Sequence, residues 1–150
     1  MAYIPRNVLT LSIAAADADH VELVLQIAWQ SWSALERVVA PRGALATFAS
    51  EIRAFASHQR PEIRFAAGTA EAGLLEVVVS EYGRTRKASV GVHLAQAVEP
   101  HGTLTWPTEL RMQVPTEHGL LGEFGADLAQ VVATDSGTAA LRLLRHWPLS

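Results

Sequence analysis

The clearest secondary-structure signal in this chain is the stretch HVELVLQIAW, residues 20–29. Apolar residues occupy every second position from Val21 to Trp29, and polar residues such as Glu22 and Gln26 fall between them. This period of two indicates a β-strand with one buried face and one solvent-facing face. We therefore expect the strand to lie against a hydrophobic core.

The segments on either side of this strand extend the pattern. Residues 8–13 alternate in the same way, and the polar residues 17–20 between the two strands predict a turn, because Asp side chains bond their own backbone. Together these segments predict a hairpin. Residues 31–40 fit either a helix or a continued, bulged strand, and Pro41 then interrupts the chain.

Two segments have the apolar spacing of amphipathic helices. The first runs from Leu45 to Phe55. The second has its apolar stripe over residues 121–132, and Thr116 is predicted to cap its start with a side-chain hydroxyl. Residues 138–147 favour a short third helix, although a final strand also fits them.

Four further segments have strand character, and Gly83 predicts a hairpin turn between the second and third of them. These strands are Glu62–Ala66, Leu74–Glu81, Lys87–Gln96 and Thr108–Val114. The predicted order is two strands, a helix, four strands and a helix. It indicates a two-layer α+β domain over residues 1–150, with one antiparallel sheet of about six strands and both helices on one face.

Composition narrows the possible functions. The 150 residues carry a net charge of -3, which argues against binding nucleic-acid phosphates. There are no cysteines, which excludes disulfides, zinc–cysteine sites and cysteine nucleophiles. No apolar run is long enough for a membrane span and no signal peptide is recognisable, so we expect a cytoplasmic protein that does not bind membranes.

The histidines show no metal-ligand spacing, and the sequence predicts no metal site and no cofactor. Asp17, Asp19 and His20 could bind a cation, but a polar turn explains them more simply. Glu117 and His118 at a predicted helix start form the candidate site of an alternative, enzymatic or ligand-binding function, with His118 as an acid or base.

Other residues are candidates for protein interaction. Trp32 and Trp106 fall in irregular segments, where an exposed tryptophan marks an interface. Tyr82, Arg84 and Arg86 form a basic and aromatic cluster at a predicted hairpin tip, where an anion or an acidic protein surface could bind.

The pattern resembles small bacterial immunity proteins of polymorphic toxin systems, of the WapI-inhibitor type. The resemblance covers roughly residues 20–133 and lies in the strand ending in Trp29, the helix Leu45–Phe55, the following strands and the apolar stripe from Leu121. It implies a toxin-neutralising or similar protein-binding role. The family's acidic-Gln-Thr pattern before the last helix is replaced here by residues 116–119, so no binding residue is implied.

These observations predict a non-enzymatic protein-interaction domain. A small enzyme or ligand-binding protein that uses Glu117 and His118 is the alternative. With 49% hydrophobic residues and open sheet edges, the chain is also expected to form a homodimer.

Overall fold

The computed structural model describes residues 6–69, 72–83, 86–98 and 106–149 of the chain. These residues contain eight strands and two helices. In chain order they are β1 (Val8–Ala16), β2 (His20–Trp29), β3 (Trp32–Pro41), α1 (Arg42–Ala56), β4 (Glu62–Thr69), β5 (Gly73–Tyr82), β6 (Lys87–Val98), β7 (Trp106–Glu117), α2 (His118–Thr134) and β8 (Thr138–Arg142).

The strands form two antiparallel sheets of four strands each. The first has the order β3-β2-β1-β8, and the second the order β4-β5-β6-β7. The prediction of an α+β domain with antiparallel strands and two helices is confirmed, whereas the prediction of a single sheet of about six strands is wrong. Within each sheet, strands that follow one another in the chain pair with each other, and only β8 pairs with a strand far away in sequence, β1.

Two segments account for the difference. Residues 32–41 are strand β3, one of the two structures that the sequence allowed, and Trp32 pairs directly with Trp29 across a tight turn. Gln30 lies in that turn with a φ of 56°. The third helix predicted over residues 138–147 is wrong, because residues 138–142 form β8, in which Ala139 and Leu141 are buried.

Both predicted helices are present. In α1 the predicted stripe from Leu45 to Phe55 is buried. Helix α2 begins at His118, and the predicted cap by Thr116 is wrong, because its hydroxyl instead donates to the carbonyl oxygen of Arg142 at 2.8 Å. At the other end, α2 ends at Thr134, and its C-cap residue Asp135 has the left-handed conformation.

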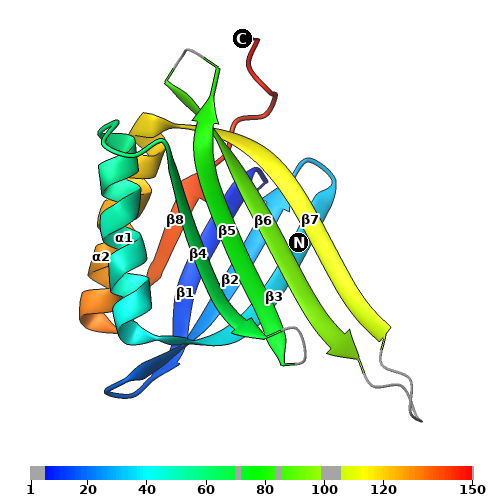
Figure 1. Ribbon diagram of the computed structural model, residues 1–150, viewed down its shortest axis with the longest axis vertical. Coiled ribbons are helices and arrows are strands. Elements are labelled where there is room, and N and C mark those ends of the chain that lie inside the picture. The colour runs from blue at the N-terminus through cyan, green and yellow to red at the C-terminus, as the bar shows by residue number, and fades with distance from the viewer. Residues whose placement is uncertain (1–5, 70–71, 84–85, 99–105, 150) are drawn as a thin grey trace, which may run out of the picture.

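Figure 1 shows α1 and α2 side by side along one side of the molecule, next to β4 and β8, with one sheet in front of the other. The two sheets and both helices share one hydrophobic core. Leu11 from the first sheet, Val79 from the second, Phe48 from α1 and Phe124 from α2 line the same small internal space. The helices therefore cover one side of the pair of facing sheets, where α1 contacts β4 and α2 contacts β8.

Candidate functional site

A cluster of three polar side chains lies where the two helices meet the second sheet. His58 follows α1, Glu81 lies near the end of β5, and His118 is the first residue of α2. The His118 Nε2 atom lies 3.0 Å from Glu81 Oε1, and His58 Nδ1 lies 3.7 Å from the same oxygen. We call this group the His58–Glu81–His118 cluster.

The three members differ in their access to solvent. His118 is only 3% exposed, whereas the side chains of His58 and Glu81 are 53% and 35% exposed. The His118 ring lies between two other rings, stacking on Phe55 at a centroid distance of 5.0 Å and on His58 at 4.3 Å. The cluster is therefore fixed on its inner side by the core and open on its outer side.

Glu117, which the sequence grouped with His118, belongs to a different contact. Its carboxylate pairs with Lys87 at 2.6 Å, on the neighbouring strand β6. His118 takes Glu81 as its partner instead, because β5 ends beside the start of α2. Sequence reasoning missed Glu81 and His58, since the contact between His118 and Glu81 spans 37 residues and follows no short motif.

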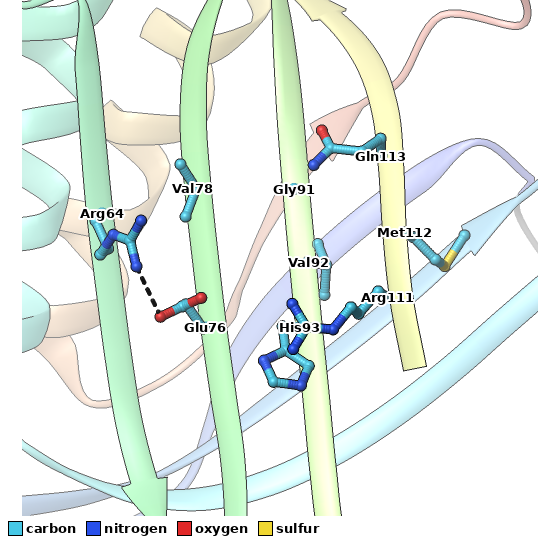
Figure 2. Close-up of a pocket in the computed structure, with 9 residues that line it drawn as sticks. All are labelled: Arg64, Glu76, Val78, Gly91, Val92, His93, Arg111, Met112 and Gln113. Atoms are coloured by element: carbon cyan, nitrogen blue, oxygen red, sulfur yellow. Dashed lines mark hydrogen bonds and ion pairs between the residues drawn. The ribbon is translucent and has the colours of Figure 1, made fainter. Parts of the chain in front are cut away.

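Strand β7 lies between two hollows. On the outer face of the second sheet, a pocket of about 330 Å³ lies over Gly91, with Arg64, Glu76, His93 and Arg111 around it (Figure 2). We call it the outer hollow. A Cβ atom at Gly91 would come within 2.7 Å of Gln113 Nε2, so glycine keeps this space open.

Some of the charged side chains around the outer hollow form ion pairs, and others do not. Arg64 pairs with Glu76 at 3.1 Å, the contact marked in Figure 2. Glu76, His93 and Arg111 are direct cross-strand neighbours on β5, β6 and β7. Among the described residues Arg111 has no ion-pair partner, and the buried His93 Nε2 has no hydrogen bond, although Glu109 lies 3.6 Å away. The hollow thus offers positive charge to a ligand.

On the inner face of the same strand lies a second space of about 390 Å³, the inner hollow. Trp29 and Trp32 from the β2–β3 turn line it, together with Leu110 and Met112 of β7. Trp32 is 65% exposed, whereas Trp29 is partly buried against the core, and its Nε1 donates to the carbonyl oxygen of Leu144 at 2.8 Å. This hollow is mainly apolar.

The remaining interaction candidates are dispersed. Strand β7 begins at Trp106, but the side chain of Trp106 lies outside the described residues, as does all of Arg84. Tyr82 packs on Trp147 at a centroid distance of 5.1 Å, and Arg86 is exposed. Among the interaction candidates whose side chains the structure describes, Trp32 is therefore the one that borders a hollow.

The turn at residues 17–20 has the geometry of an ordinary polar turn. One Asp17 carboxylate oxygen accepts hydrogen bonds from the backbone N–H groups of Asp19 and His20, at 2.8 and 2.7 Å. These bonds lower the pKa of Asp17, because they stabilise its charged form. These hydrogen bonds explain the position of the Asp17 side chain, and no bound cation is needed for it.

Comparisons with protein-family models, with curated proteins and with solved structures found no significant match for this chain. Within the described residues, neither helix combines the length and the hydropathy needed to cross a membrane.

Proposed function

We propose that the chain is a protein-interaction domain that binds an extended segment of its partner along strand β7. The observation that carries this proposal is the position of the two hollows. Both adjoin the same three residues, Arg111, Met112 and Gln113, and they lie on opposite faces of the strand. A peptide strand has side chains that alternate between two faces, so it would fill both hollows in turn.

The edge of β7 supports this mode of binding. β7 is the last strand of its sheet, and no described strand pairs with its other edge. Near the end of β7 the chain itself covers that edge, because the Leu144 N–H donates to the carbonyl oxygen of Pro115 at 2.8 Å. Among the described residues, no other backbone hydrogen bond covers the outward edge of residues 108–113, which leaves this stretch for a strand that adds to the sheet.

The side chains around the hollows define the chemistry of the partner. The inner hollow favours an apolar or aromatic side chain against Trp32 and Met112. The outer hollow favours a carboxylate, because Arg111 has no ion-pair partner among the described residues. We therefore propose a partner segment that alternates apolar and acidic residues. The resemblance to immunity proteins leads us to propose a toxin as that partner.

Two synthetic peptides of equal composition test this function. One alternates Leu and Glu over about eight residues, longer than a typical strand. The control peptide repeats the order Leu-Leu-Glu-Glu, so each face of the extended peptide carries both leucine and glutamate. We expect the alternating peptide to bind more tightly and to slow amide hydrogen exchange at residues 109–113, measured by NMR.

Variants of the chain sharpen the result. Trp32→Ala and Arg111→Glu should each weaken binding about tenfold or more, as expected for central contacts of an interface. Arg60→Glu is the matched control, because Arg60 is exposed, follows α1 and borders neither hollow. Equal binding of both peptides, or unchanged binding by the Trp32 and Arg111 variants, would contradict the proposal.

A further inference from the structure

We infer that the His58–Glu81–His118 cluster is a binding site for a divalent transition-metal ion, with Zn²⁺ as the best fit. The site is independent of partner binding along β7, because it uses none of the residues around the two hollows. Its three ligand atoms come from the turn after α1, from β5 and from α2, and all lie within 4.8 Å of one another.

The distances are close to those of a bound ion. Zinc bonds of about 2.1 Å in tetrahedral geometry place neighbouring ligand atoms about 3.4 Å apart. Around Glu81 Oε1 the observed distances are 3.0 Å to His118 Nε2 and 3.7 Å to His58 Nδ1, on either side of that value. The exposed His58 ring can turn to bring its nitrogen toward the ion, while the buried His118 stays fixed.

The chemical types of the three ligands indicate which metal ions the site would bind. Two imidazole nitrogens with one carboxylate suit Zn²⁺ and similar transition metals, whereas Mg²⁺ and Ca²⁺ prefer oxygen ligands. Three protein ligands leave one tetrahedral position free. Because His58 and Glu81 are partly exposed, that position faces solvent and would hold a water molecule.

The backbone at His58 gives independent support. His58 has a φ of 61° immediately after the C-cap of α1. Its N–H donates to Phe55 and the N–H of Gln59 donates to Ala54, both at 2.9 Å, which is the Schellman arrangement that ends many helices. Glycine is the usual residue at this left-handed position, and histidine is strained there. The helix end at this residue places the His58 ring beside His118, with its Nδ1 facing the same Glu81 oxygen as His118 Nε2.

The hydrogen bonding of His118 leaves Nε2 available to a metal. Among the described residues its Nδ1 is buried without a hydrogen-bond partner, so nothing on that side fixes the ring proton. Without an ion, Nε2–H donates to Glu81. With an ion, the proton moves to Nδ1, and the Nε2 lone pair and the Glu81 carboxylate both bind the metal.

Calorimetric titration of ZnCl₂ into the full chain, prepared without a histidine tag, tests the site. We expect one ion per chain, and Co²⁺ at the same site should give the visible absorption of a four-coordinate ion. Glu81→Gln and His58→Gly should each weaken zinc binding by at least about a hundredfold. Loss of a residue that only supports a metal ligand already weakens binding by up to about this factor, and here a ligand itself is lost.

His58→Gly also separates binding from folding. Glycine relieves the strained φ, so this variant should melt no lower than the parent while it loses zinc affinity. His146→Ala is the matched control, because His146 is an exposed histidine after β8 that is outside the cluster, and this variant should leave affinity unchanged. No zinc binding by the parent, or equal binding by the His58 and Glu81 variants, would overturn the inference.

Discussion

Arg42 and Asp135 connect the beginning of α1 to the end of α2 through a bidentate ion pair. Arg42 Nη1 pairs with Asp135 Oδ1, and Nη2 donates to Oδ2 at 3.0 Å. Nη2 also donates to the carbonyl oxygen of Asp17 at 2.7 Å. One guanidinium thus contacts both helix ends and the first hairpin. The hydrogen bonds that Arg42 donates to Asp135 lower the pKa of the Asp135 carboxyl and raise the pKa of Arg42.

The lowered pKa of Asp135 predicts how the pair depends on pH. A carboxyl whose pKa is lower in the folded than in the unfolded chain stabilises the fold above its unfolded value, about 3.9, and loses that effect as pH falls through the folded value. We expect Asp135→Asn to lower the free energy of unfolding at pH 7 and to have a smaller effect at about pH 2, where the carboxyl is increasingly protonated. Urea denaturation at both pH values measures the difference.

Asparagine is the suitable replacement at this position, because it tolerates the left-handed φ of 54° found at Asp135. The control is Asp127→Asn, at an exposed position on α2. If both variants change stability equally at pH 7, the contact with Arg42 does not stabilise the fold.

The aromatic core supplies the second prediction. Phe48, Phe55 and Phe124 are each at most 2% exposed, and Phe48 stacks on Phe65 at 4.8 Å. Replacing any one of the three by alanine should lower the free energy of unfolding by about 3–5 kcal/mol, because a cavity opens between the sheets and helices. Chemical denaturation measures the loss. Values below about 1 kcal/mol at all three positions are incompatible with a shared core.

Gly125 provides a third test, because it lies where α2 approaches α1. A Cβ atom there would come within 2.8 Å of Arg53 Cγ and 3.1 Å of Ile52 Cγ2. Gly125→Ala should therefore destabilise the protein by about 1–3 kcal/mol, despite alanine's better helix propensity. Gly119→Ala, in the same helix with no atom within 4 Å, should instead stabilise by up to about 1 kcal/mol. Equal effects at both sites would contradict the close helix contact.

Self-association is the fourth prediction. The edge strand β3 exposes Leu35 and Val39, at 52% and 60%. We expect light scattering at micromolar concentration to approach twice the 16.2 kDa mass of the chain, because a two-fold contact would cover this apolar edge. Leu35→Glu should restore the monomer mass, and Gln130→Glu, an exposed position on α2, should not. A parent mass of one chain, unchanged on tenfold concentration, would falsify the dimer.

Local patterns in the sequence predicted most elements but not their assembly into two sheets. The alternation over residues 20–29 and the helical stripe from Leu45 to Phe55 each depend on residues close in sequence, so they could be recognised directly. The tail could not, because alanine, leucine and arginine favour helix, while pairing of residues 138–142 with β1 imposes a strand. The β2–β3 turn lacks the usual glycine or asparagine, so residues 32–41 stayed ambiguous.

Contacts between residues distant in sequence also limited the prediction of the two candidate sites. His118 could be selected from the sequence, because it sits at the start of a predicted helix. Its partner could not, since Glu81 reaches it only after β5 and α2 pack together. The outer hollow likewise depends on Gly91 lying opposite Gln113, a cross-strand register that no local pattern specifies.

The pairing of β8 with β1 sets an order of events during translation. Ser12 lies opposite Thr138, so β8 completes a sheet whose other three strands are synthesised more than ninety residues earlier in the chain. Before β8 is synthesised, the edge of β1 that later pairs with β8 is open, and Leu9 and Leu11 are only partly covered. The second sheet has no such dependence, because its four strands follow one another along the chain. We therefore expect a nascent chain arrested after α2 to recruit chaperones to its N-terminal third.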